Sequence, residues 1–414
     1  MTSPSGNLNI SPIPQFKTVL RVVWGGRGFP GLNKETPDGL QRIEGKGQNA
    51  EWHDKVGIMS ESPGTIFAII DGGTSNIRVI LTREDSILAK GYSRVGAKDR
   101  VVQGDEDVLI TGIKTALGEC LGKSDQKELQ PGDLDCCIIL GMLTSNVGLL
   151  DLEHLTAPVG VEELAQGLVL KKIPELLPCP TFFIRGVKNA VDPEKDPHLL
   201  QQIDSMRGEE TQTMGIIDLL PDLPLPTLIT FLSSHTKYVR VGEQGQITGA
   251  LTTMSGQIFG AIKNHTYLSR YIPDDNMIRL DEITHDDLWA GITAEREMGF
   301  LRAIHMPRFV DVVLKAPIER CYSYLQGALI GSDLRSFSFL REVMSLDFQS
   351  LVFIGNNNRP ALYREVFSKE VGQDIPMYAL DEESMEEAVV RGSIKIFRYA
   401  EKERFSRPGR GLGA

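Results

Sequence analysis

The stretch Asp71–Ser75 places one acid, two glycines and two hydroxyl side chains between two apolar segments. Glycine lets backbone N–H groups approach phosphate oxygens because no Cβ stands in the way, and the hydroxyls add donors. A carboxylate at the end of a strand suits Mg²⁺, which keeps much of its water shell. We therefore expect a phosphate cradle with its metal acid, Asp71; a hairpin turn without a ligand is the alternative. The expected phosphate-binding residues are Gly72, Gly73, Thr74 and Ser75.

The segments 66–70 and 77–81, which flank this turn, are rich in β-branched residues and predict a β-hairpin. A weaker copy of the pattern occurs at 228–241, where a short turn with hydroxyl side chains again separates two strand-like runs. Two similar hairpins about half a protein apart indicate two lobes of related fold with a cleft between them.

The remaining elements predict an α/β protein. Apolar periodicity indicates a helix over 108–121, and the S-x-x-E spacing from Ser384 is typical of a capping box before a last helix. Short apolar runs predict buried strands that end in small or polar residues. Because ligands of open α/β sheets bind beyond the carboxyl ends of strands, we expect the chemistry in the loops that follow. These runs are 136–143, 181–184, 228–232 and 351–354.

Composition restricts the classes of function. The 414 residues suffice for two domains, and the formal net charge of -11 argues against non-specific nucleic-acid binding. No run approaches the roughly 18 apolar residues of a membrane span. The five cysteines lack the paired spacing of a zinc site and predict reduced thiols. We expect a soluble cytoplasmic protein with no membrane or nucleic-acid partner; its oligomeric state stays open.

Several motifs resemble those of one kinase family. Ser205–Gln212 reads SMRGEETQ and is similar to the M-R-G-E-E-T-Q segment of the 2-dehydro-3-deoxygalactonokinases. In chain order, Gly141–Gly148, His235–Val239 and Thr253–Gln257 resemble three further motifs of that family. Asp71–Arg78 resembles the first phosphate motif of the actin/hexokinase ATPase superfamily. The resemblance covers about 66–397 and implies a two-lobed actin-like ATPase (ribonuclease H-like) fold with an interlobe cleft.

The resemblance implies that ATP and Mg²⁺ serve to phosphorylate the terminal hydroxyl of 2-dehydro-3-deoxy-D-galactonate, a small sugar acid. Gly208-Glu209 occupies the place of a Gly-Asp in related sugar kinases, so Glu209 is the expected base and Glu210 the second choice. Adjacent carboxylates repel, which raises the pKa of one of the two. An ordinary helix N-terminus with two acids is the alternative.

Other roles follow from the same resemblance, and each has a structural alternative. Lys237 is expected to contact the γ-phosphate as a point charge, but it also fits a solvated strand edge. Arg207 is expected on the substrate carboxylate, or in a structural salt bridge. The second turn and the adenosine loop are expected to bind the nucleotide through Ser234, Thr236, Gly355 and Asn356. The expected partners of the sugar hydroxyls are Ser145 and Asn146, although Asn146 also fits a turn.

The chain departs from the family pattern, and Leu232-Ser233-Ser234 stands in place of its P-G-T. Ser233 replaces a glycine in the second turn, Leu149 stands in place of a tryptophan, and Gln257 in place of a glutamate. Two alternatives therefore stay open: a kinase for a different keto or aldonic sugar acid, and a degenerate nucleotide-binding scaffold. The preference between galactonate and gluconate substrates also stays open.

The ends of the chain read differently from its middle. Residues 1–58 are rich in Gly, Pro, Asn and Ser and predict an irregular extension, dispensable to a protein that starts at Met59. We expect an N-terminal lobe over 59–225, a C-terminal lobe over 226–400 and a flexible tail over 401–414.

Overall fold

The computed structural model describes residues 64–105, 107–123, 129–342, 344 and 347–406. The chain divides into units 1–48 and 49–414, and the described residues all belong to the second. The expectations for residues 1–58 and for a start at Met59 lie outside the described residues.

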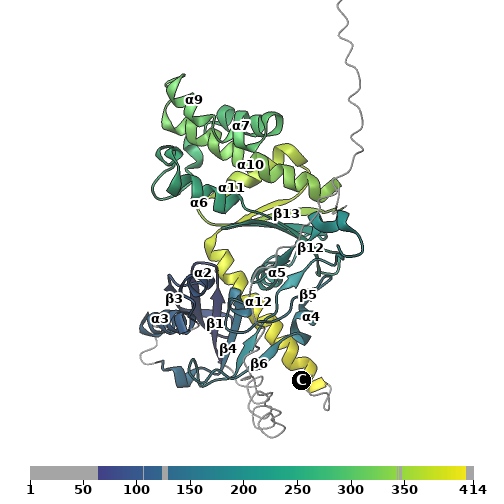
Figure 1. Cartoon of the computed structure of the whole chain (residues 1–414). Coiled ribbons are helices and arrows are strands. Elements are labelled where there is room, and N and C mark those ends of the chain that lie inside the picture. Colours follow the sequence, from purple (N-terminus) through teal and green to yellow (C-terminus); the bar gives the residue numbers. More distant parts are fainter. Residues whose placement is uncertain (1–63, 106, 124–128, 343, 345–346, 407–414) are drawn as a thin grey trace, which may run out of the picture. The chain divides into compact units, whose positions relative to one another are not determined.

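The first sheet has six strands in the order β3-β2-β1-β4-β7-β6 (Figure 1). β1 pairs antiparallel with β2 and parallel with β4, and Gly72 and Gly141 are partners at the end of the latter pair. β1 and β4 read as almost continuous apolar runs because helices cover both faces of the sheet. The strands are β1 (Ile66–Gly72), β2 (Ile77–Arg83), β3 (Ser86–Ser93), β4 (Cys136–Gly141), β6 (Val169–Lys171) and β7 (Thr181–Phe183).

The second sheet repeats this arrangement with five strands in the order β12-β11-β10-β13-β14. β10 forms a hairpin with β11 and pairs parallel with β13, so that Leu232 and Gly355 are partners where Gly72 and Gly141 are in the first sheet. The strands are β10 (Thr227–Leu232), β11 (Thr236–Val241), β12 (Ile247–Thr253), β13 (Ser350–Gly355) and β14 (Met377–Leu380). The predicted pair of related lobes is therefore confirmed.

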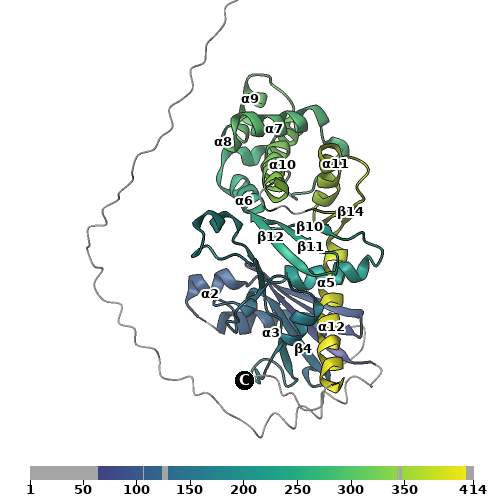
Figure 2. The same ribbon diagram turned by 90° about the vertical axis from the view of Figure 1, so that its right-hand side faces the viewer.

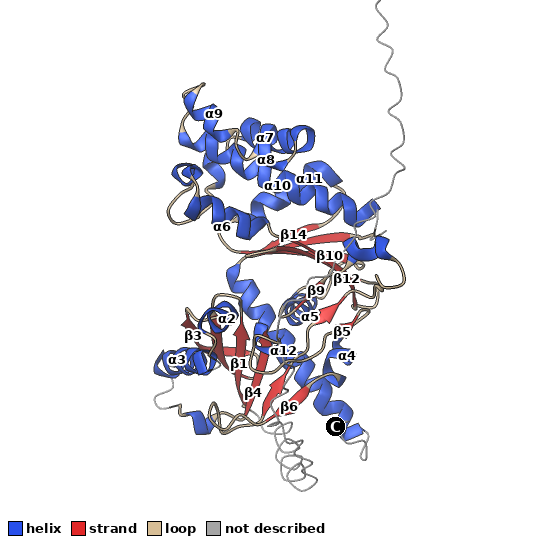
Figure 3. Cartoon of the chain, viewed as in Figure 1, coloured by secondary structure: helices blue, strands red, loops and turns tan. Residues whose placement is uncertain are grey.

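Helices pack against the faces of both sheets (Figure 3). The first sheet carries α3 (Asp107–Lys123) on one face, as the periodicity over 108–121 predicted. The second carries a helical layer on its outer face, in which the long helix α10 packs against α7 (Figure 2). This layer consists of α6 (Ser255–His265), α7 (His285–Met298), α8 (Phe300–Ala303), α9 (Pro307–Val312), α10 (Ile318–Glu342) and α11 (Arg359–Val371).

Short elements complete the fold around the first sheet. A small sheet has the order β5-β8-β9. Two short helices lie before and after β4 in the chain, one between β3 and α3 and the other between β5 and β6. These elements are β5 (Leu155–Thr156), β8 (Val187–Lys188), β9 (Ser205–Met206), α2 (Ala97–Gln103) and α4 (Val161–Gln166).

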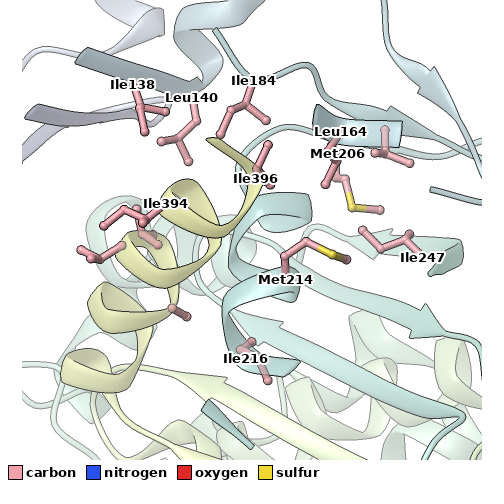
Figure 4. Close-up of a cluster of buried hydrophobic side chains, with 14 of the residues drawn as sticks. Ile138, Leu140, Leu164, Ile184, Met206, Met214, Ile216, Ile247, Ile394 and Ile396 are labelled. Carbon is pink, nitrogen blue, oxygen red and sulfur yellow. The ribbon is translucent and has the colours of Figure 1, made fainter. Parts of the chain in front are cut away.

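Two crossing helices, α5 (Glu209–Leu219) and α12 (Glu382–Ser406), lie between the sheets and share one core with both (Figure 4). The two backbones can approach closely because residue 215 is a glycine. A Cβ there would fall 1.9 Å from the carbonyl oxygen of Ala388. A Cβ at Gly392 would likewise fall 1.9 Å from the carbonyl oxygen of Thr211. The helix that carries Glu209 is thus held in place by glycine-mediated contact with α12.

Two sequence expectations for α12 need correction. The helix starts at Glu382 and not after Ser384, because Asp381 provides the cap: its Oδ1 accepts from the backbone N of Ser384 at 2.9 Å. The helix also continues to Ser406, so the expected tail from 401 begins as helix, in which Glu401 is buried.

Candidate active site

A cavity of about 1330 Å³ opens between the two hairpin turns, where both sheets end. It brings together most of the residues that the sequence singled out, from both lobes. Three of those residues do not line it: Glu210, Thr236 and Gly355. The expected residues that line it are Asp71, Gly72, Gly73, Thr74, Ser75, Ser145, Asn146, Arg207, Glu209, Ser234, Lys237 and Asn356.

The first turn is held rigidly by its neighbours. Gly73 donates its N–H to the carbonyl of Asn76 at 2.8 Å, which closes the turn. The first backbone N–H groups of α2, from Ala97 and Lys98, donate to the carbonyls of Gly73 and Thr74 at 3.1 and 3.0 Å. Because these carbonyls are already used, the turn presents exposed Gly73 and Thr74 to the cavity in one fixed conformation.

Asp71 is the residue before the last of β1 and lines the cavity. Burial, the largest cause, raises the pKa of Asp71; Arg78 opposite it in the hairpin lowers it, and Glu209 raises it. Gly141 leaves room for the carboxylate, since a Cβ there would fall 2.8 Å from Oδ1. A half-buried carboxylate that faces a second acid across such a space fits a hard divalent cation such as Mg²⁺.

Glu209 and Lys237 meet where the lobes join. Glu209 is the first residue of α5, after Gly208, which adopts φ 104°. Lys237, on β11 of the second sheet, is only 6% exposed. Its Nζ lies 3.6 Å from Glu209 Oε1 and donates to the carbonyl of Ser205 at 2.7 Å. The solvated strand-edge alternative for Lys237 therefore does not hold.

Glu210 points away from the cavity. Its two carboxylate oxygens accept from the N–H of Gly208 at 2.9 and 2.8 Å, and it is 1% exposed. Burial, followed by repulsion from Glu209, raises the pKa of Glu210 to about 8. The raised pKa that we expected in this pair thus falls on the acid that caps the helix.

Arg207 holds a loop instead of presenting a free fork. Its guanidinium donates to the carbonyls of Thr144 and Leu152, and to Thr144 Oγ1 at 3.0 Å. This loop carries Ser145, whose hydroxyl donates to the carbonyl of Met142 at 2.7 Å, and Asn146, which is exposed in the cavity.

The second turn uses hydroxyls in its own structure. Thr236 is fully buried and its hydroxyl shares a hydrogen bond of 2.6 Å with Ser255. Ser234 Oγ lies 3.3 Å from His235 Nδ1, so the two side chains pair within the turn. Burial, followed by Lys237, lowers the pKa of His235. Of the expected second-turn residues, Ser234 is the one whose hydroxyl faces the cavity region.

A second cavity of about 250 Å³ adjoins the first and shares Ser233, Ser234 and Asn356 with it. It is lined on the α10 side by Tyr322 and Gln326, each 6% exposed. The buried Tyr322 hydroxyl donates no hydrogen bond to any residue that the structure describes. An unused donor and an amide therefore face a space beside the second turn.

Other findings concern metals, thiols and membranes. Within the described ranges, no group of three or more His, Cys, Asp or Glu residues is arranged to hold a metal ion. All five cysteines are free and buried, as expected for reduced thiols. None of the helices described here combines the length and the apolarity that a membrane crossing requires.

Sequence reasoning missed several residues of the main cavity. His154 lines it, and so do Arg78 and Asp204. Arg78 was visible as the end of the first phosphate motif, but nothing in the sequence around His154 and Asp204 marked them. They belong to segments that come together only through the small sheet β5-β8-β9.

Comparisons with known proteins point to one family. The sequence profile of the 2-keto-3-deoxy-galactonokinase family matches residues 71–395. A curated relative from Rhizobium meliloti (strain 1021), named Probable 2-dehydro-3-deoxygalactonokinase DgoK1, is 25% identical over 217 residues. That match covers 50% of this chain and 60% of the relative, so the chain spans about three fifths of its length.

A solved structure shares the fold. It is a protein from Sinorhizobium meliloti, provisionally assigned as a 2-dehydro-3-deoxygalactonokinase, with a TM-score of 0.59 and 21% identity. The similarity covers 83% of this chain and 99% of that chain. The two-lobed actin-like α/β fold expected from the sequence is confirmed.

Proposed function

Because the chain belongs to the 2-keto-3-deoxy-galactonokinase family, we propose that it transfers the γ-phosphate of ATP to the terminal hydroxyl of 2-dehydro-3-deoxy-D-galactonate. The observation that carries this proposal is one cavity in which Asp71, Glu209 and Lys237 line the space between two hairpin turns. Phosphoryl transfer needs positioned phosphates, charge stabilisation and a base, and little covalent chemistry.

Glu209 is the base in this proposal. Its carboxylate faces the cavity, whereas that of Glu210 is occupied by the N–H of Gly208. Glu209 accepts the proton of the sugar hydroxyl as the oxygen attacks the γ-phosphorus. Lys237, 3.6 Å from Glu209, stabilises the negative charge on the phosphoryl oxygens and orients the carboxylate.

The two turns hold the phosphates from opposite walls. Gly73, Thr74 and Ser75 offer backbone N–H groups and hydroxyls from the first turn, and Ser234 offers its hydroxyl from the second. Asp71 would hold Mg²⁺, which supplies charge neutralisation to the phosphates when it is bound. One or two carboxylates with water and phosphate suffice for Mg²⁺, so a larger cluster of acids is not needed.

The smaller cavity takes the nucleoside. It continues the main cavity at Ser234 and Asn356, where the second turn meets the end of β13. Gln326 offers both an acceptor and a donor, the pair that an amide uses to bind the N6 and N7 atoms of adenine. ATP thus lies along the second lobe, and the sugar acid lies on the side of Asn146 and Arg207. Cytoplasmic location is part of the proposal, because free thiols suit a reducing compartment.

The experiment is an ADP-release assay with 2-dehydro-3-deoxy-D-galactonate, the gluconate analogue and other aldonic acids, with and without Mg²⁺. We expect turnover with the galactonate compound that needs Mg²⁺. Glu209→Gln should lower kcat by about 10²–10⁴-fold, the usual contribution of a general base. Glu243→Gln, an exposed acid in a turn outside the cavity, is the matched control and should be unchanged. A fully active Glu209→Gln enzyme would remove Glu209 from this role.

A further inference from the structure

His154 stands in one corner of the main cavity with a single ring nitrogen still unused. Its Nδ1 lies 3.5 Å from the Nη2 of Arg207. Because a guanidinium has donors only, Nδ1 must be the acceptor, and the ring hydrogen then resides on Nε2. Among the described residues, no hydrogen bond occupies that Nε2–H. The corner therefore contains a donor of defined tautomer that lines the cavity.

The pair of His154 and Arg207 is built into the local packing. A Cβ at Gly186 would fall 2.8 Å from His154 Cδ2 and 2.6 Å from Arg207 Cγ, so glycine leaves the space that both side chains fill. The Arg207 guanidinium is fixed in turn by the carbonyls of Thr144 and Leu152. With these bonds made, Arg207 orients His154 and has few N–H groups left for a ligand.

The corner is positive although the chain as a whole is acidic. Burial, followed by Arg207, Lys188, Lys237 and Arg185, lowers the pKa of His154 to about 4. Four cations thus act on a ring that stays neutral at physiological pH, which favours an anion as its ligand.

Acids also lie near this corner, and Glu210 and Asp151 act on Arg207. Asp151 and Glu153 line the cavity with exposed side chains. The backbone carbonyl of Glu153 accepts from Arg185 Nε at 2.7 Å. The Asp204 carboxylate accepts from the backbone N and the hydroxyl of Thr252. The Asp204 carboxylate is therefore already bound by donors of its own.

We propose, on the basis of the proposed function, that His154 binds the carboxylate of the sugar acid through Nε2–H. Arg185, Lys188 and Arg207 supply the positive potential, and Arg207 is the positioning residue that sets the tautomer. The sugar acid then lies with its terminal hydroxyl at Glu209 and its carboxylate at His154. This replaces the direct Arg207–carboxylate contact that we expected from the sequence.

The test separates KM from kcat in the ADP-release assay. His154→Phe removes the donor and should raise KM for the sugar acid about 10–100-fold, the value of a hydrogen bond to a charged group. We expect kcat to change less than about threefold, because the base and phosphate sites are intact. His154→Gln keeps an N–H donor and should stay within about fivefold of the wild type in KM. His198→Phe, at an exposed histidine outside the cavity, is the matched control.

Two further measurements distinguish a carboxylate contact from a structural role. In calorimetry, His154→Phe should weaken binding of the carboxamide of the sugar acid less than binding of the acid, because the amide oxygen still accepts from Nε2–H but carries no charge. KM of the wild type for the acid should show no titration of His154 between pH 6 and 8. ATP affinity and circular dichroism should match the wild type if the variant is folded. If His154→Phe does not fold, Arg185→Gln combined with Lys188→Gln tests the same positive corner and should also raise KM.

Other results would overturn the carboxylate contact, the neutral donor or the kinase function. An unchanged KM in His154→Phe, or in the Arg185/Lys188 double variant, overturns the carboxylate assignment and leaves the kinase proposal standing. Equal losses for acid and carboxamide, or a KM that rises as pH passes 6.5, overturn the neutral-donor contact. A wild-type enzyme that neither binds nor phosphorylates any sugar acid overturns the proposed function, and this inference with it.

Discussion

The contact between α5 and α12 can be perturbed by a single methyl group. Gly392 lies where α12 crosses α5, and a Cβ there would fall 1.9 Å from the carbonyl oxygen of Thr211. Ordinary contact begins at 3.4 Å, so Gly392→Ala must separate the helices locally by about 1.5 Å (3.4 − 1.9). Backbone lies on both sides of this contact, so no flexible side chain can move aside.

The cost follows from two opposing terms. Overpacking in a tight core costs about 1–3 kcal/mol. Alanine in a helix recovers at most about 1 kcal/mol relative to glycine. We expect a net loss of about 1–2 kcal/mol. Thr211 is two residues after Glu209 on α5, so the displacement also moves the proposed base, and a 1 Å misplacement can reduce a rate about 10²-fold.

The assay compares thermal unfolding and ADP release for wild type, Gly392→Ala and Gly118→Ala. Gly118 is exposed in α3, and a Cβ there meets nothing within 4 Å. Its alanine variant should be about 0.5–1 kcal/mol more stable, with unchanged activity. Gly392→Ala should lower both Tm and kcat. Wild-type Tm and kcat in Gly392→Ala would refute the packing argument, and a lowered Tm with normal kcat would separate packing from the position of Glu209.

Three other substitutions test buried polar groups. The folded protein holds the Glu210 proton up to about pH 8, above the ordinary pKa of 4.5, so its contribution to stability is lost as pH rises through that window. The free energy of unfolding of Glu210→Gln should therefore rise relative to that of wild type between pH 5 and pH 8, by a few kcal/mol at about 1.4 kcal/mol per pKa unit; a difference that stays constant with pH would contradict this. Asp333→Asn should lower stability by about 1–3 kcal/mol in urea unfolding, because the buried carboxylate accepts from Tyr363 and Thr253, and unchanged stability would contradict that. Gln326→Leu should raise KM for ATP about tenfold and lower the ratio of kcat/KM for ATP to kcat/KM for GTP. If neither KM for ATP nor that ratio changes, Gln326 is excluded from base recognition.

The strands and hairpins could be predicted because their signals are local. β1 and β4 are continuous apolar runs, and the Gly-Gly turn between β1 and β2 permits only a tight connection. The ends of the strands also indicated the position of the candidate site, since Gly72 and Gly141 are partners in the parallel pair and both lie beside Asp71. An apolar run that ends in small or polar residues therefore predicts a residue of the candidate site where a strand end forms that site.

Side-chain roles that depend on distant partners could not be predicted in the same way. Glu209 and Glu210 are neighbours in sequence, yet one faces the cavity and the other caps the helix through Gly208. Which carboxylate faces the cavity depends on where α5 begins, at Glu209 directly after Gly208, and the sequence does not state this. Arg207 similarly looks like a ligand until the carbonyls of Thr144 and Leu152 are placed around it.

The position of Ser233 bears on the alternative of a degenerate scaffold. That alternative rests on the loss of a glycine from the second turn. The protein's own packing needs a glycine there only if the backbone adopts a positive φ or touches another backbone at Cα. Ser233 is not among the residues of positive φ, so a side chain costs no strain. The close approach is instead provided by Gly256 of α6, where a Cβ would fall 2.1 Å from the carbonyl of Ser233. Gly355 provides it on the other side, against the carbonyl of Leu232 at 2.6 Å. The glycines that this turn requires are therefore present in its neighbours, and Ser233 adds a hydroxyl to the wall that would face the phosphates.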